Sequence, residues 1–373
     1  MEQIKALLQQ FTEFAAQPQK SIQEHKAATG KGAVGVLPYY APEELIYASG
    51  YLPVGIWGGQ KQIKKAPTYL PAFACSIMQS VMEMELEGAY DIFDAILMSV
   101  PCDTLKCLSQ KWKGTAPVIV FTHPQNRKLE SANQFLVEEY KIVKAKLEKI
   151  LGVTISTEAI QKAIAVYNAN KQATRLFLEI AAAYPQVINP IDRHAVMKAR
   201  LFMDKAKHTA LLQQLIAAIT VLPITPWQGK RVVLTGITAE PNEFLALLQE
   251  FNIAVVADDL AQESRQVRVD TPNHRDPLYA LAKAWQNFDG CSLAVNTKKP
   301  RGSMLIDMVH KYGADAVIVC MMKFCDPEEW DYPVMYREME EAGVKSLMLE
   351  IDQQTVSFEQ AKTRIQSFVE MLA

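Results

Sequence analysis

Residues 94–122 read DAILMSVPCDTLKCLSQKWKGTAPVIVFT, and this stretch is the clearest indication of the fold. Two continuous apolar runs, at 94–100 and 117–122, flank a segment with helical spacing. A continuous apolar run of this length is typical of a strand that is covered on both faces, and a helix is the usual connection between two parallel strands. The stretch therefore predicts a β-α-β unit of a parallel sheet with a right-handed crossover.

The same alternation extends toward both ends of the chain. Further strands are expected at 32–37, 53–57, 231–236, 253–257, 316–321 and 346–351. A helix is predicted after Pro42, because this proline is followed by two glutamates, which favour a helix start. Other helical patterns, such as 242–250 and 303–312, separate the strands of the last third. The predicted fold class is α/β, with two parallel-sheet domains of the Rossmann or flavodoxin-like type.

The middle of the chain has a different character. From about 131 to 219 the apolar residues recur every three to four positions, which predicts helices, and Ser156 or Thr157 is expected to cap one of them. We predict an N-terminal α/β domain, a helical region and a C-terminal α/β domain. Their boundaries are 1–130 with Cys75 and Cys102, 131–225, and 226–373 with Cys325.

The composition excludes several classes of protein. The 373 residues are 49% hydrophobic and 21% charged, which suits a folded chain and excludes a disordered or fibrous one. The 39 Lys and Arg nearly balance the 41 Asp and Glu, so the charge favours neither a nucleic acid nor an anionic membrane as partner. No apolar leader and no run of about 18 apolar residues occurs, so we expect a cytoplasmic protein without membrane spans.

The cysteines are candidates for a metal site. They are Cys75, Cys102, Cys107, Cys291, Cys320 and Cys325. They are too few for a disulfide scaffold, and reduced thiols that cluster are typical of metal binding or catalysis. No C-x-x-C pair occurs, so the common zinc-ribbon and ferredoxin spacings are absent. A single cysteine is most often a small buried hydrophobe, which is our interpretation of Cys291 and Cys320. Cys107 is either a neighbour of the site or part of helix packing.

Cys102 and Cys325 share a context that indicates a ligand site. Each follows an apolar strand, at the end where open α/β sheets bind ligands, and each precedes a predicted helix that Asp103, Thr104 or Asp326 is expected to cap. The N–H groups of a helix start favour the thiolate, which is the metal-binding form of cysteine. Three thiolates that converge from two domains would hold three corners of an iron–sulfur cluster and leave one iron open.

At these cysteines the chain resembles the 2-hydroxyacyl-CoA dehydratase family, specifically the β subunit of its dehydratase component. The resemblance covers essentially the whole chain. Its landmarks are PEELIYASGYLPVGIWGG (42–59), YLPAFACS (69–76), VPCDTLKCLSQKWKG (100–114), FTHPQNR (121–127), ADDLAQESRQ (257–266), MMKFCDPEEWDYP (321–333), EIDQQ (350–354) and FEQAKTRIQSFVEML (358–372). Within the family, these sequence blocks are most similar to those of the enzymes that dehydrate lactoyl-CoA, and the enzymes that dehydrate 2-hydroxyisocaproyl-CoA are near relatives.

The resemblance implies an αβ heterodimer in which each subunit holds a 4Fe–4S cluster through three cysteines, here Cys75, Cys102 and Cys325. It also implies an ATP-dependent iron–sulfur activator protein and a flavin, FMN or riboflavin, in the complex. The implied reaction is the reversible removal of water from an (R)-2-hydroxyacyl-CoA, with lactoyl-CoA to acryloyl-CoA as the best match, through a ketyl radical. The cluster of this chain would be mainly an electron relay, so no residue here is expected to be a catalytic base.

A radical route avoids a barrier that makes the direct removal of water difficult. The β C–H group of a saturated acyl-CoA is far too weak an acid for any side chain, and hydroxide is a poor leaving group. General acid–base catalysis contributes about 10²–10⁴-fold, which is too little for such a barrier. One-electron chemistry therefore has to come from a cofactor that the protein places and insulates.

Other interpretations stay open at this point. The acyl chain could be 2-hydroxyisocaproyl or 2-hydroxyglutaryl, and the chain could be a non-catalytic partner whose cysteines hold a structural metal or nothing. Gly236, with Asp258 and Asp259, hints at a dinucleotide fold, but the G-x-G-x-x-G pattern is missing, which disfavours a nicotinamide enzyme. His123 follows a predicted strand, where a loop contact and a site role are both open.

Overall fold

Two four-stranded sheets, each entirely parallel, are the framework of the described residues, 1–37 and 40–372, in the computed structural model. The first sheet contains β1 (Ala33–Leu37), β2 (Leu52–Gly55), β3 (Ala95–Ser99) and β4 (Val118–Phe121). The second contains β5 (Lys230–Gly236), β6 (Ile253–Leu260), β7 (Ala316–Met321) and β8 (Lys345–Glu350). The strand orders, β2-β1-β3-β4 and β6-β5-β7-β8, are the same. The predicted fold class is confirmed.

All eight expected strands are present, and β6 is the one that differs most. It continues to Leu260, beyond the expected end at 257, and every residue in it is buried. Asp258 and Asp259 can stay in a buried strand because both form ion pairs with arginines. A hydropathy pattern does not show such pairing, so the sequence predicts that the strand ends earlier, at 257.

Helices cover the sheets and fill the space beside them. They are α1 (Glu2–Ala16), α2 (Pro18–Thr29), α3 (Glu43–Ala48), α4 (Ser76–Leu86), α5 (Asp103–Lys111), α6 (Glu130–Leu151), α7 (Thr157–Ala183), α8 (Pro190–Ala199), α9 (Lys205–Thr220), α10 (Asn242–Glu250), α11 (Pro277–Gln286), α12 (Arg301–Tyr312), α13 (Asp326–Glu341) and α14 (Glu359–Met371). Two short 3₁₀ turns, η1 (Ala66–Thr68) and η2 (Ser264–Val267), lie in loops. None of the helices among the described residues is long and apolar enough to cross a membrane.

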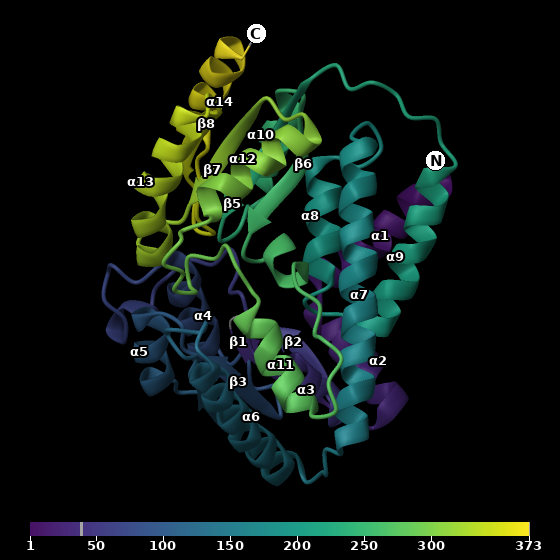
Figure 1. Cartoon of the computed structure of the whole chain (residues 1–373), viewed down its shortest axis with the longest axis vertical. Helices are drawn as coiled ribbons and strands as arrows, with labels where there is room; N and C mark the ends of the chain where they lie inside the picture. The colour runs from purple at the N-terminus through teal and green to yellow at the C-terminus, as the bar shows by residue number, and fades with distance from the viewer. Residues whose placement is uncertain (38–39, 373) are drawn as a thin grey trace.

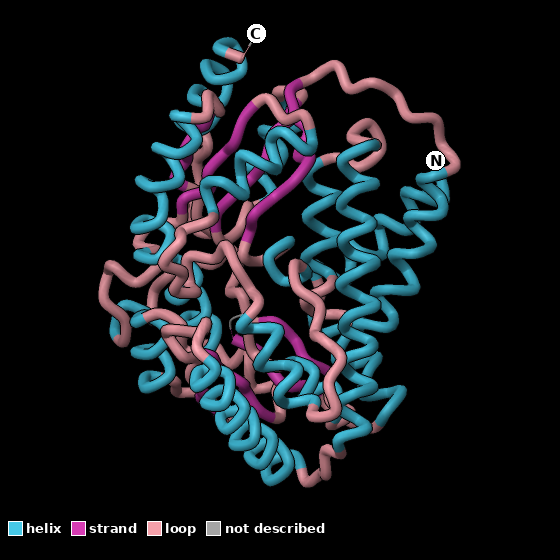
Figure 2. Tube along the Cα trace, viewed as in Figure 1, coloured by secondary structure: helices cyan, strands magenta, loops and turns pink. Residues whose placement is uncertain are grey.

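The long helices α1, α7, α8 and α9 form a column beside both sheets (Figure 1). Ser156 caps α7 as predicted, because its side chain accepts a hydrogen bond from the Ala159 N–H at 3.1 Å. Helix α6 packs on β3 and β4, and α11, from the last third of the chain, packs on α6. Figure 2 shows the two groups of strands in magenta as separate sheets. The predicted domain boundaries stay a prediction.

The core around the first sheet also takes in residues from the C-terminal part of the chain. Trp285 and Phe288, at and after the end of α11, belong to it, as do Met322 and Cys325 after β7. The second sheet has its own apolar clusters, and the helical column has another. The two sheets are therefore joined by a shared core at the point where β7 ends.

Candidate cysteine site where the two sheets meet

Three helices of the protein begin at a cysteine. Cys75 is the N-cap of α4, Cys102 is the N-cap of α5 after β3, and Cys325 is the N-cap of α13 after β7. In Figure 1, α13 lies above α4 and α5. The expectation that Asp103, Thr104 or Asp326 would be the cap is wrong: Asp103 and Asp326 are the first helical residues, and the cysteine itself takes the cap position.

The cap position aims backbone N–H groups at each sulfur. The groups concerned are those of Ile77 and Met78 for Cys75, of Thr104 and Leu105 for Cys102, and of Glu328 for Cys325. These N–H groups lower the pKa of each thiol and so favour the thiolate. The arrangement prepares three sulfurs to carry negative charge.

The charge of Cys102 acts on Cys75, and the charges of Cys75 and Cys102 act on Cys325, so the three thiols lie within range of electrostatic interaction. Burial is the main cause that raises the pKa of Cys75 to about 12, and the charge of Cys102 contributes to the same rise. Burial also raises the pKa values of Cys102 and Cys325, and the charges of Cys75 and Cys102 add to the effect at Cys325. Cys325 is buried and Cys75 and Cys102 are half-buried, so three thiolates at this place need a compensating positive charge, which a bound metal group would provide. The predicted ligand set is thus brought together from both sheets.

No group of three His, Cys, Asp or Glu side chains within the described part of the chain is arranged as around a single metal ion. In an iron–sulfur cluster, each cysteine binds a different iron, so the ligands are spread over a larger object than one ion. A single ion such as zinc instead gathers its ligands at one point.

A buried ion network supports the helix that begins at Cys325. Glu328, one turn into α13, accepts hydrogen bonds from Arg265 at 3.0 Å and from Arg301 at 2.9 Å. Both arginines also bind Asp259 at the end of β6, at 3.0 Å and 3.2 Å. All four residues are at most 3% exposed. This network was not predicted from the sequence, although acidic and basic residues in apolar surroundings at 257–266 were a signal for it.

The remaining cysteines have different surroundings. Cys107 is exposed on α5, and Cys320 is buried within β7, as expected for a small hydrophobe. Cys291 is buried but not purely apolar in its contacts, because the Tyr40 hydroxyl and the Arg265 guanidinium both donate to its sulfur. Simple hydrophobic packing is therefore an incomplete description of Cys291.

Two other sequence candidates also have structural contacts. His123 is 7% exposed and packs against Trp285, and burial lowers the pKa of its ring to about 4. It is therefore a neutral side chain in an aromatic cluster. Asp259 is fully occupied by Arg265, Arg268 and Arg301, so its carboxylate is not available to a nucleotide ribose.

Comparison with known proteins gives a consistent result. Residues 38–372 match the family model of the 2-hydroxyglutaryl-CoA dehydratase D-component. The chain is 64% identical to the lactoyl-CoA dehydratase subunit beta of Anaerotignum propionicum, over 100% of both chains. It is 42% identical to the (R)-phenyllactyl-CoA dehydratase beta subunit of Clostridium sporogenes, over 97% of each chain. It is 37% identical to the (R)-2-hydroxyglutaryl-CoA dehydratase subunit beta of Acidaminococcus fermentans, over 99% of this chain and 100% of that one.

These matches cover nearly the whole chain at identities well above the level at which folds alone are shared. They confirm the family that the sequence blocks indicate. The chain belongs to the 2-hydroxyglutaryl-CoA dehydratase D-component family.

Proposed function

We propose that this chain is the β subunit of an (R)-2-hydroxyacyl-CoA dehydratase, a hydro-lyase that converts lactoyl-CoA to acryloyl-CoA reversibly by a radical route. The family match and the 64% identity to a lactoyl-CoA dehydratase subunit support this function. The word "beta" in the names of these relatives supports an α subunit as the partner. An ATP-dependent iron–sulfur activator protein is the proposed source of the electron, and a flavin stays a prediction with no residue assigned.

The cysteine site is the part of the proposal that rests on geometry. We propose that Cys75, Cys102 and Cys325 hold a 4Fe–4S cluster, and the observation that supports it is that three mutually interacting thiols lie at three helix N-termini. The donor set fits such a group, since thiolates are its usual ligands. When bound, the cluster supplies one-electron transfer.

The chain's own residues have three tasks at this site. The helix N–H groups stabilise negative charge on the sulfurs. The apolar core excludes water, since Cys325 is only 8% exposed and Cys75 and Cys102 pack against the core of the first sheet. The network of Glu328, Arg265 and Asp259 holds the start of α13 in position. Binding, insulation and placement are what a relay requires of its protein.

Metal analysis of the anaerobically prepared αβ complex tests the proposal. We expect iron and acid-labile sulfide in this chain and dehydration of lactoyl-CoA in preference to 2-hydroxyglutaryl-CoA and 2-hydroxyisocaproyl-CoA. Cys75→Ser is expected to remove the iron of this chain and the activity together, because the set loses one of three ligands. Cys291→Ser, a matched change of a buried cysteine nearby, is expected to keep the iron.

Two results would contradict the proposal. A colourless complex without iron or sulfide would indicate a non-catalytic partner. Retention of iron in Cys75→Ser with loss of iron in Cys291→Ser would show that the ligand set is wrong.

A further inference from the structure

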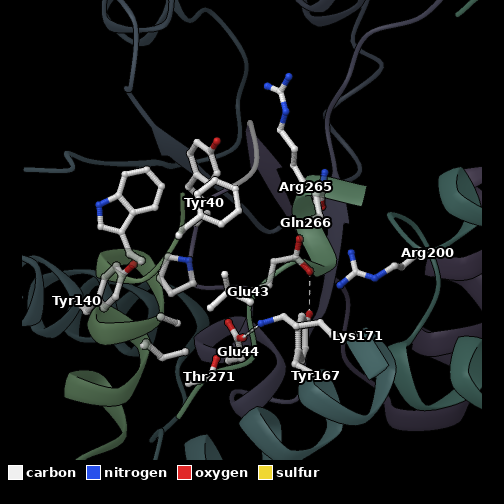
Figure 3. Close-up of a pocket in the computed structure, with 17 residues that line it drawn as sticks. Tyr40, Glu43, Glu44, Tyr140, Tyr167, Lys171, Arg200, Arg265, Gln266 and Thr271 are labelled. Carbon is white, nitrogen blue, oxygen red and sulfur yellow. Dashed lines mark hydrogen bonds and ion pairs between the residues drawn. The ribbon is translucent and has the colours of Figure 1, made fainter. Parts of the chain in front are cut away.

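A cavity of about 130 Å³ lies beside the start of α3, and it is lined by side chains from α3, α7, η2 and α11 (Figure 3). None of the three cysteines of the candidate site lines it. One end is charged, with Lys171 and Arg200 as its cations. The other end is apolar, with Leu281, Trp285 and Phe288 among its walls. A cavity with a charged end and an apolar end is typical of a small-molecule site.

The polar groups at the charged end lack the partners that burial normally requires. Arg200 is 3% exposed, and its Nε donates to Asn170 at 2.7 Å, but its two terminal nitrogens bind no described residue. Lys171 is 9% exposed, and its Nζ forms a long ion pair with Glu44 at 3.8 Å, which leaves it without a hydrogen bond to any described residue. The Thr271 hydroxyl is buried and has no hydrogen-bond partner among the described residues.

The glutamates of the cavity leave Arg200 without an ion pair. Figure 3 shows the Arg200 guanidinium pointing toward the Glu43 carboxylate and Lys171 reaching toward Glu44. Glu43, however, is already bound by the Tyr167 hydroxyl at 2.8 Å and by Lys205 at 3.2 Å. Glu44 forms its ion pair with Lys171, and burial raises the pKa of its carboxyl. One guanidinium charge is left without an ion pair, which favours an added anion.

The size of the cavity limits the ligand. An engineered cavity of about 150 Å³ holds benzene, so about 130 Å³ suits a molecule of about six non-hydrogen atoms. This is enough for a carboxylate of three or four carbons and far too little for a coenzyme A. The unsatisfied Thr271 hydroxyl offers a hydrogen bond to a second polar atom of the ligand.

We propose that this cavity binds a free short-chain 2-hydroxycarboxylate, with Arg200 and Lys171 on its carboxylate and Thr271 on its hydroxyl. The binding is separate from the cysteine site and needs no cluster. The nearest connection is Arg265, which lines the cavity and also binds Glu328 under the Cys325 helix.

Equilibrium dialysis of the full chain with radiolabelled lactate tests the proposal. We expect saturable binding at one site, weaker binding of propionate by about fivefold for one lost hydrogen bond, and no binding of the neutral lactamide. The larger 2-hydroxyisocaproate is expected not to compete. A lactoyl thioester of pantetheine is also expected not to displace lactate, because it has no free carboxylate.

Variants of the cavity residues test which side chain contacts which group of the ligand. Lys171→Met is expected to weaken lactate binding at least about tenfold, which is the cost of one charge-assisted hydrogen bond. Lys162→Met, the same change at an exposed position of α7, is the matched control and is expected to bind as the wild type does. Thr271→Val, which keeps the shape, is expected to remove the preference for lactate over propionate and to keep the affinity for propionate.

The proposal is overturned if the wild type shows no saturable binding or binds lactamide equally well. Displacement by the thioester would show that the acyl end of a CoA ester, rather than the free acid, is the ligand. These ligand tests on the wild type do not depend on whether a variant folds. They measure binding alone, so a negative result leaves the proposed cluster and dehydratase activity untouched, and absence of iron leaves the binding result untouched.

Discussion

Cys102 and Cys325 occupy equivalent positions in the two sheets. Each is the N-cap of the helix that follows the third strand of its sheet in chain order, β3 for Cys102 and β7 for Cys325. Each of these strands lies beside the first strand of its own sheet. The two thiols are therefore delivered to the site by the same local structure, repeated once.

The equivalence predicts that the two cysteines are equally necessary. Cys102→Ser and Cys325→Ser are each expected to reduce the iron content of the anaerobic chain to background, because each removes one ligand of three. Cys107→Ser changes the exposed cysteine on the same helix as Cys102 and should retain its iron. Quantification of iron and sulfide in each variant measures the effect. Loss of iron in Cys107→Ser would contradict the assignment of Cys102 and Cys325 as the ligands.

Glu328→Gln is expected to destabilise the protein strongly. The change leaves Arg265 and Arg301 buried with fewer negative partners, and breaking a buried ion pair costs about 3–5 kcal/mol. Urea unfolding followed by circular dichroism measures the loss. The control is Glu341→Gln at the exposed end of the same helix, where we expect a change within about 0.5 kcal/mol. Equal stability of the two variants would show that the network contributes little.

The stability of the protein is expected to fall in alkaline solution because of His194. Burial alone would lower the pKa of this histidine, but Glu240 and Glu263 outweigh burial and raise it to about 9. A folded-state pKa above the unfolded value of about 6.5 stabilises the fold at low pH, and this contribution is lost between about pH 6.5 and 9. The full effect is about 3 kcal/mol.

Thermal unfolding between pH 6 and 9.5 measures this dependence. The wild type is expected to lose stability across that range, while His194→Gln should start lower and show a flatter profile. Profiles of equal slope for the two proteins would rule out His194 as the titrating group.

Gly236→Ala is expected to be far more destabilising than an ordinary glycine replacement. Gly236 ends β5 with φ +142°, and a Cβ there would lie 2.2 Å from the carbonyl oxygen of Cys320 on β7. Clash and backbone strain together are expected to cost about 3 kcal/mol. At Gly313, with φ +56° and open space around it, alanine should cost only about 1 kcal/mol. Urea midpoints compare the two, and equal losses would contradict the predicted clash.

The sequence predicted the strands well because they are continuous apolar runs. The run at 94–100 became β3, and the run at 316–321 became β7 with the same bounds. Cys102 and Cys325 could be placed at strand ends for the same reason. The position of Cys75 as the N-cap of α4 was not predicted, because no apolar strand runs directly up to it.

The parts that sequence did not predict depend on residues far apart in the chain. The contact of Arg265 with Glu328 joins residues whose side chains meet only after both sheets have formed. The cavity likewise needs Lys171 and Arg200 from the helical column beside Trp285 from α11. The local periodicity of apolar residues carries no information about contacts between distant parts of the chain, so these contacts are seen only in the folded structure.

The position of Cys325 has a mechanical consequence. Cys325 follows a strand of the second sheet, whereas Cys75 and Cys102 belong to the part of the chain that forms the first. A group bound by all three would therefore tie the two halves of the molecule together. Without that tie, the halves are joined by their shared core and by polar contacts such as the one from Gln353 to the Trp57 carbonyl, 2.9 Å long. If the proposed cluster is bound there, its oxidative loss would loosen the contact between the two halves and would not be confined to the electron transfer that we propose.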